Sequence, residues 1–133
     1  AMDVWRRMIQ AQGGDPDAPM PVAPHQHQIL AERDGVVSRL DAMGVGVAAW
    51  RLGAGRARKE DLIEMSSGIT IHRTVGEEVR KGEPILTLHT ETEGRMPRGL
   101  QALSEACGGA GSIEVGDSAP ERRIVLETLG TVA

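Results

Sequence analysis

Gly35 to Arg56 read GVVSRLDAMGVGVAAWRLGAGR, and this stretch decides the fold of the chain. It begins with a short apolar strand, and Asp41 then stands where an aspartate caps the N-terminus of a helix. The helix carries two internal glycines, Gly44 and Gly46, each of which costs about 1 kcal/mol relative to alanine. We therefore expect another backbone, here a sheet, to lie close against both glycines.

The same stretch ends in Leu52-Gly53-Ala54-Gly55-Arg56, which is typical of a helix C-terminal cap. A glycine there takes the left-handed conformation, and the arginine lies near the last carbonyls of the helix. The alternative is a phosphate cradle. A dinucleotide fingerprint, however, requires a further glycine three residues after Gly55, where Arg58 stands, and a strand before the glycines. A helix C-terminus also repels anions, so we expect a structural cap.

Further motifs follow in a fixed order. A strand ending in Val-Ser (Gly35 to Ser38) comes first, followed by Leu-Gly-Ala-Gly-Arg (Leu52 to Arg56) and an acidic Asp-x-Ile-Glu segment (Asp61 to Glu64). Gly-Ile (Gly68-Ile69) and a Gly-x-x-Val-x-x-Gly turn (Gly76 to Gly82) come next. Together they resemble the C-terminal domain of the thymidine phosphorylase and pyrimidine-nucleoside phosphorylase family. The opening segment, Trp5 to Asp15, looks like the helix that precedes this domain. One departure is Glu64, which stands where Asp is more common in the family.

Composition and charge limit the function classes. The 133 residues fit one domain, and 40% are hydrophobic, but Phe and Tyr are absent, so the core must be built from aliphatic side chains. The net charge is −4 and the basic residues are scattered, which argues against a nucleic-acid partner. The single cysteine, Cys107, excludes an internal disulfide framework and suits a reducing compartment. No apolar run approaches about 18 residues. We expect a cytoplasmic protein without a membrane partner.

The hydrophobic pattern predicts an α+β fold with a mostly antiparallel sheet and two or three helices. Helices are expected at residues 3–12 and from Pro97 onward, with a stripe of Leu100, Leu103 and Cys107. After a proline-rich connector, and separated by loops, we expect strands at residues 25–33, 36–40, 69–73, 85–89, 113–115 and 123–129. A turn at Asp34-Gly35 precedes the second strand, a helical turn is expected within 56–67, and Gly76 and Gly82 need positive φ.

The resemblance implies an α/β-hammerhead related to the barrel-sandwich hybrid of biotinyl and lipoyl domains. It divides the chain at residue 34. Residues 1–34 would hold the last helix of the catalytic domain, a proline-rich connector and a strand, and residues 35–133 the phosphorylase C-terminal domain.

His25 and His27 are the obvious metal candidates, because side chains two residues apart on a strand share a face. Zinc requires three or four ligands, and no further ligand stands at a recognisable spacing, so we expect a solvated pair. His72 and His89 fall on expected strands near a sheet edge.

Acidic and thiol side chains are the next candidates. Glu60, Asp61 and Glu64 suggest acid–base or metal chemistry, but no histidine or second carboxylate cluster converges on them, so a solvated acidic loop is expected. Cys107 has no activating base beside it, and we expect a small core residue.

The glycine turn at Gly76 to Gly82 suggests a second class of function, that of a carrier domain, because lipoyl and biotinyl carriers have the same turn. Such carriers hold a modified lysine at a hairpin tip, whereas Lys59 stands in a charged run and Lys81 within the turn itself. The alternative to the phosphorylase is therefore a free-standing binding or carrier-like module of the barrel-sandwich type.

Phosphorolysis requires a phosphate cradle, groups that stabilise the departing base and a group that manages its proton. In the family these lie upstream, in a Ser-Gly-Arg-Gly run and a Gly-Gly-Thr-x-Asp segment that this sequence lacks. We therefore expect no catalytic, cofactor-binding or metal residue here. The resemblance implies a homodimeric parent enzyme that uses phosphate and a pyrimidine nucleoside without a cofactor.

Overall fold

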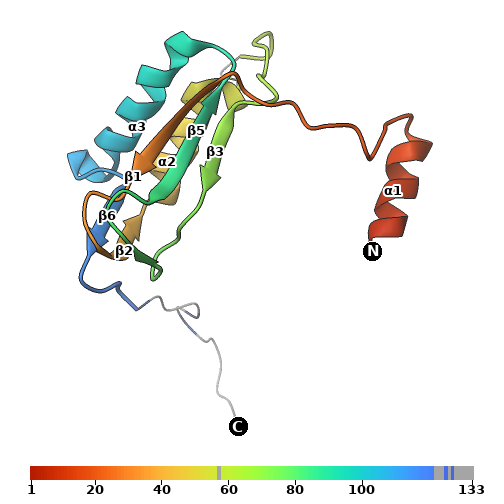
Figure 1. Ribbon diagram of the computed structural model, residues 1–133. Helices are drawn as coiled ribbons and strands as arrows, with labels where there is room; N and C mark the ends of the chain where they lie inside the picture. The colour runs from red at the N-terminus through yellow and green to blue at the C-terminus, as the bar shows by residue number, and fades with distance from the viewer. Residues whose placement is uncertain (57, 122–124, 126, 128–133) are drawn as a thin grey trace.

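The structure is a computed structural model that describes residues 1–56, 58–121, 125 and 127 (Figure 1). Helices and strands alternate irregularly along the chain. They are α1 (Met2–Ala11), β1 (His25–Leu30), β2 (Gly35–Leu40), α2 (Ala42–Ala49), the π-helical turn η1 (Trp50–Ala54), β3 (Gly68–Ile71), β4 (Glu78–Val79), β5 (Pro84–Thr90), the 3-10 turn η2 (Glu93–Arg95), α3 (Met96–Gly109) and β6 (Ile113–Gly116).

The strands form two three-stranded sheets, with orders β1-β5-β3 and β4-β2-β6. Every pairing is antiparallel. The predicted α+β class with antiparallel strands is therefore confirmed. Although β1 and β2 are consecutive, they belong to different sheets, so the link between them crosses from one sheet to the other.

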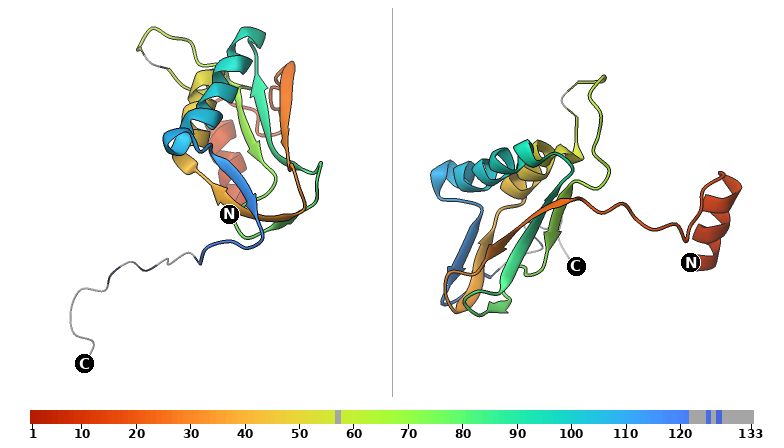
Figure 2. Two further views of the ribbon diagram at one scale, coloured as in Figure 1. Left: turned by 90° about the vertical axis from the view of Figure 1, so that its left-hand side faces the viewer. Right: turned by 45° about the horizontal axis from the view of Figure 1, so that its top comes forward.

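The core lies between the helices and the strand β5. Figures 1 and 2 show α2 and α3 side by side on one side of the β1-β5-β3 sheet. Leu52 from η1 and Leu86 and Leu88 from β5 are completely buried, together with Val37 from β2. The core is aliphatic, as the composition requires.

The glycines of α2 have different surroundings. Asp41 caps the helix as predicted, because its Oδ2 accepts a hydrogen bond from the Gly44 N–H at 2.6 Å. A Cβ at Gly44 would meet Ser112 Oγ and would lie 2.6 Å from the Ala106 Cβ, whereas a Cβ at Gly46 would meet nothing within 4 Å. The prediction that a sheet presses on both glycines is wrong. Helix α3 and the residue before β6 approach Gly44, and Gly46 lies on the exposed side of α2.

Local backbone signals were predicted well. Gly76 and Gly82 have φ of +97° and +87°, and Pro97 lies in the first turn of α3. The backbone N–H of Gly76 donates to Val37 O and that of Gly82 to Ala31 O, so each turn is tied to a neighbouring segment. These two turns flank the short strand β4, which the sequence pattern did not indicate.

Other predictions were wrong or are not covered. Cys107 is exposed and has φ of +54°, because α3 loses helical geometry over residues 106–108, so it is not a core residue. The described residues within 56–67 form turns rather than a helical turn. The strand expected at 123–129 lies outside the described residues, apart from Val125 and Glu127.

Helix α1 lies apart from the sheets at the end of an extended connector (Figure 1). None of its residues is buried, and the side chains of Val4, Trp5 and Met8 are 60%, 41% and 49% exposed. None of the helices in the described part of the chain is long and apolar enough to cross a membrane.

Candidate functional site

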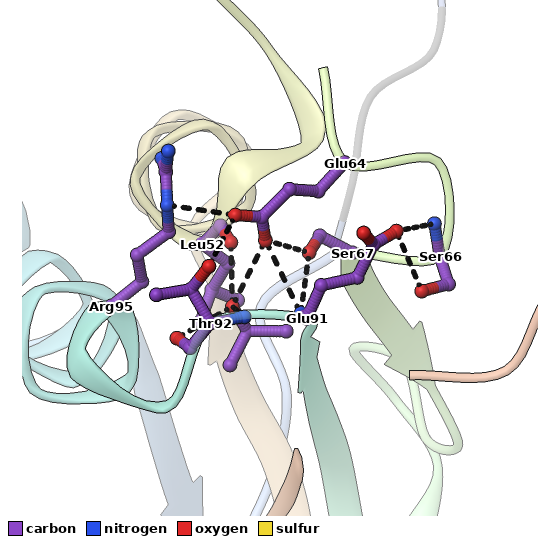
Figure 3. A network of polar contacts seen from close by, with 8 residues as sticks. Leu52, Glu64, Ser66, Ser67, Glu91, Thr92 and Arg95 are labelled. Carbon is purple, nitrogen blue, oxygen red and sulfur yellow. Dashed lines mark hydrogen bonds and ion pairs between the residues drawn. The ribbon is translucent and has the colours of Figure 1, made fainter. Parts of the chain in front are cut away.

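Glu64 is the centre of a polar network where the loop before β3 meets the end of β5 (Figure 3). Its side chain is only 13% exposed. Oε1 accepts a hydrogen bond from Thr92 Oγ1 at 2.7 Å and lies 3.0 Å from Arg95 Nε. Oε2 accepts hydrogen bonds from Ser67 Oγ at 2.8 Å and from the Glu91 backbone N–H at 3.2 Å. The carboxylate therefore joins three segments of the chain.

Gly53 is shaped around this carboxylate. Its φ is +117°, and a Cβ at this position would lie 2.6 Å from Glu64 Oε2. The Glu64 backbone N–H also donates to Gly53 O at 3.0 Å. Next to this pair, the fully buried Thr90 donates its hydroxyl to Leu52 O at 2.8 Å. Both contacts fix the end of η1 against the loop and against β5.

A second carboxylate extends the network along the loop. Glu91 Oε1 accepts hydrogen bonds from the Ser66 backbone N–H at 3.0 Å and from Ser66 Oγ at 2.9 Å (Figure 3). Glu64 and Glu91 therefore hold two consecutive serines, Ser66 and Ser67, just before β3 begins at Gly68.

Electrostatics keeps Glu64 ionised. Burial alone would raise the pKa of this carboxyl, but hydrogen bonds from Thr92 and Ser67, the charge of Arg95 and the N–H of Glu91 outweigh it and hold the pKa below the ordinary value. A carboxylate with a lowered pKa and hydrogen bonds to both of its oxygens is a poor proton acceptor. The arrangement can hold the loop in place, and it is not suited to acid–base catalysis.

A cleft of about 670 Å³ lies beside the network. Trp50, Leu62 and Ile63 supply its apolar wall, and Arg51 and Arg98 are among its charged residues. Three arginines and three carboxylates line it in all, so their charges balance and the cleft does not select an anion by net charge.

The histidines do not assemble a metal site. His25 and His27 lie on β1 opposite Thr90 and Leu88, and in the described residues no group of three or more His, Cys, Asp or Glu side chains is placed to hold a metal ion. His72 Nε2 is hydrogen-bonded to Thr87 Oγ1 at 2.7 Å, as His89 Nε2 is to the hydroxyl of another strand threonine. His89 thus contacts the neighbouring strand β3, and His72, one residue after the end of β3, contacts β5.

The glycine-rich end of the central stretch is a structural cap. Gly53 takes positive φ as predicted, whereas Gly55 is extended, with φ of −142°. The side chain of Arg56 contacts the following loop, where its Nη1 donates to Lys59 O at 3.4 Å.

The acidic segment divides into two environments. Glu60 and Asp61 are exposed, and Asp61 Oδ2 accepts a hydrogen bond from the Arg58 backbone N–H at 2.9 Å. The prediction that Glu64 is a solvated loop residue is wrong. The available signal was the run Thr90 to Thr92 at the end of a strand, since hydroxyl groups and a free N–H there suit a carboxylate.

Neither lysine has the surroundings of the modified lysine in a lipoyl or biotinyl carrier. Lys59 and Lys81 are both exposed. The backbone N–H of Lys81 donates to Asp34 Oδ1 at 2.7 Å within the glycine turn. This contact ties the turn to the link between β1 and β2, so Lys81 is part of a structural turn.

Comparison with known proteins agrees with this structural picture. The family model of the pyrimidine nucleoside phosphorylase C-terminal domain matches residues 36–108. The thymidine phosphorylase of Mycobacterium tuberculosis (strain H37Rv) is 42% identical over 126 residues, which are 95% of this chain and 28% of that relative. The pyrimidine-nucleoside phosphorylases of Staphylococcus epidermidis (strain ATCC 12228) and Bacillus subtilis (strain 168) are 42% and 43% identical over 98 residues, 70% of this chain and 23% of each relative.

This chain thus spans less than a third of the length of these relatives. The match begins in β2 and continues through α2, the Glu64 network and most of α3. Since residues 36–108 are more than half of the 133 residues, the chain belongs to the pyrimidine nucleoside phosphorylase C-terminal domain family.

Proposed function

We propose that this chain serves as the C-terminal domain of a pyrimidine-nucleoside phosphorylase, a pentosyltransferase. The intact enzyme would catalyse the reversible phosphorolysis of thymidine to thymine and 2-deoxyribose 1-phosphate. The observation that carries this proposal is the 42% identity to a thymidine phosphorylase over 95% of the chain. A free-standing binding or carrier-like module is not favoured, because the relatives are phosphorylases and both lysines lie outside a carrier context.

The proposed domain division follows the sequence. Residues 1–34 hold the last helix of the catalytic domain, a connector and a strand, and residues 35–133 hold the C-terminal domain. Support comes from the apolar side chains of α1, because Trp5 is 41% exposed and Met8 is 49% exposed. Such a face is stabilised by a partner, and here the partner is the catalytic lobe of the same polypeptide.

The domain itself contributes no catalytic residue and no cofactor or metal site. Its most elaborate polar constellation, around Glu64, is built from hydrogen bonds that saturate the carboxylate and suit a structural clamp. The domain would buttress the catalytic lobe and help to set how the lobes close. The parent enzyme would use phosphate and a pyrimidine nucleoside as a cytoplasmic homodimer.

The test is an assay of thymine release from thymidine and phosphate. The 133-residue chain is expected to give no turnover above buffer, and a polypeptide that also contains the catalytic lobe is expected to give phosphate-dependent release. Turnover by the chain alone would overturn the assignment of chemistry to the catalytic lobe. An inactive but folded longer protein would overturn the proposed reaction.

A further inference from the structure

Large apolar side chains lie exposed beside the Glu64 network. Trp50, Leu62, Ile63 and Met65 are 43%, 87%, 43% and 78% exposed. The first three form the apolar wall of the cleft described above, and Met65 follows Glu64 in the same loop. We call these four side chains the apolar patch. Exposed apolar side chains that gather on one part of a surface, rather than singly, mark an interaction site.

The backbone that carries the apolar patch is fixed. Glu64 is clamped by the network of Figure 3, so its exposed neighbours Ile63 and Met65 are held in place on either side of it. The ring of Trp50 lies against the backbone of Gly55, where a Cβ would be 2.8 Å from Trp50 Cδ1. A preorganised surface loses less conformational entropy on binding than a mobile loop does.

Charged side chains surround the apolar patch. Those that line the cleft with it include Arg51, Arg95, Arg98, Asp61 and Glu91. An apolar centre with a polar rim is typical of protein–protein interfaces, and Trp and Arg are enriched among the residues that contribute most to their affinity. The surface therefore has the composition of a protein-binding site.

The chain enters the two sheets at the same end of the molecule as the apolar patch. Figures 1 and 2 show the loop 58–67 and the start of β1 at this end, where the connector from α1 arrives. Ala23, just before β1, is only 4% exposed, so the connector is fixed there. The matched residues make up 28% of the Mycobacterium tuberculosis relative, so most of that protein lies outside the match.

We propose that the apolar patch is the surface on which the catalytic lobe of the same polypeptide docks. The inference rests on the proposed function, which places that lobe before a C-terminal domain and therefore at the connector. The connector, residues 12–24, spans about 45 Å when fully extended, so one lobe can contact both α1 and the patch. The Glu64 network then positions the docking surface.

Two methionines provide a matched test by oxidative footprinting. Met65 is 78% exposed in the apolar patch, and Met43 is 74% exposed near the start of α2, at the opposite end of this helix from Trp50. In a polypeptide that contains the catalytic lobe, oxidation of Met65 is expected to be about fivefold slower than in the 133-residue chain, because susceptibility follows exposure. The oxidation rate of Met43 is expected to be the same in both proteins.

An unchanged oxidation rate of Met65, or protection of Met43 instead, would overturn the proposal. Protection of Met65 in the 133-residue chain that grows with protein concentration would also overturn it, since a second copy would then cover the patch. Thymidine phosphorolysis is assayed on the same samples. Turnover with an unprotected Met65 would contradict the docking surface alone, whereas a protected Met65 without turnover would contradict the proposed reaction alone.

Serine variants test whether the contact is stabilising. Leu62→Ser combined with Met65→Ser is expected to lower the melting temperature of the longer polypeptide by about 3 °C and to leave that of the 133-residue chain within about 1 °C. Met43→Ser, the control, is expected to leave both within about 1 °C. Equal shifts of the double variant in the two proteins would show that its effect arises within this domain, and would contradict docking at the patch.

Discussion

At the scale of single residues, Glu64 shows how a buried carboxylate can be structural. In place of water, its carboxylate oxygens are contacted by Thr92, Ser67, Arg95 and the backbone N–H of Glu91, each within 3.2 Å. Charge-assisted hydrogen bonds of this kind are stronger than neutral ones, and the loss of one partner leaves the others unsatisfied. The network should therefore contribute to stability while taking no part in proton transfer.

Substitution of Glu64 tests this contribution. Glu64→Gln keeps the size of the side chain but removes its charge and turns an amide NH₂ toward hydrogen-bond donors. We expect the free energy of unfolding to fall by about 1–3 kcal/mol. Urea denaturation of the 133-residue chain measures it, with Glu60→Gln in the exposed part of the same loop as the control. Equal stability of the two variants would show that the network contributes nothing.

The lowered pKa of Glu64 predicts an acid-sensitive part of the stability. In the unfolded chain this carboxyl has its ordinary pKa of 4.5, and in the folded chain its pKa is lower. As pH falls, the unfolded state binds the proton first, so the stabilisation is complete above pH 4.5 and is lost as pH falls through the folded pKa.

Unfolding free energies of the chain and of Glu64→Gln, measured between pH 7 and pH 3, should therefore converge at the acid end. The comparison is needed because the pKa of Glu77 is also lowered, by hydrogen bonds from the backbone N–H and hydroxyl of Thr74. A difference between the two proteins that stays constant with pH would contradict the assigned pKa direction.

At the scale of elements, we expect alanine substitutions at the two glycines of α2 to change the free energy of unfolding in opposite directions. Gly44→Ala places a methyl group against Ser112 and Ala106, so we expect a loss of about 1–3 kcal/mol. Gly46→Ala points into open space in the helix interior, and we expect a gain of about 0.5–1 kcal/mol from helix propensity. Chemical denaturation of both variants measures the difference. Similar changes at the two positions would contradict the packing of α2 against α3.

The elements also show which features the sequence could predict. Features with a local cause were correct: the cap at Asp41, the positive φ at Gly76 and Gly82, and the start of α3 near Pro97. Features that depend on distant partners were missed. Gly44 has close neighbours because the end of α3 and Ser112 lie against it, whereas Gly46 faces away from them. Cys107 is exposed because α3 loses its helical geometry at residues 106–108.

The Glu64 site illustrates the same limit. Its partners stand between three and 31 positions away in the sequence, and only the pairing of β3 with β5 brings them together. A run of Glu60, Asp61 and Glu64 has the composition of a solvated loop, and nothing local separates the buried carboxylate from the exposed ones. Gly53 was predicted as part of a helix C-terminal cap, but its close approach to Glu64 could not be predicted from the local pattern.

At the scale of the whole molecule, α1 should be stabilised only by a larger assembly. In this chain none of its residues is buried, so Trp5→Ser should change the unfolding free energy of the 133-residue chain by less than about 0.5 kcal/mol. In a polypeptide that contains the catalytic lobe, the same substitution should lower the melting temperature, which scanning calorimetry measures. An unchanged melting temperature there would contradict the proposed docking of α1.

We propose that this chain provides the C-terminal domain of a phosphorylase and that the chemistry takes place in the rest of the polypeptide. The most direct measurement is thymidine phosphorolysis by a chimera in which this chain replaces the matching 126 residues of the Mycobacterium tuberculosis thymidine phosphorylase. We expect the chimera to have a kcat/KM within about tenfold of that of the parent, which is a loss of no more than about 1.4 kcal/mol in transition-state stabilisation. A folded chimera with no phosphorolysis would contradict it.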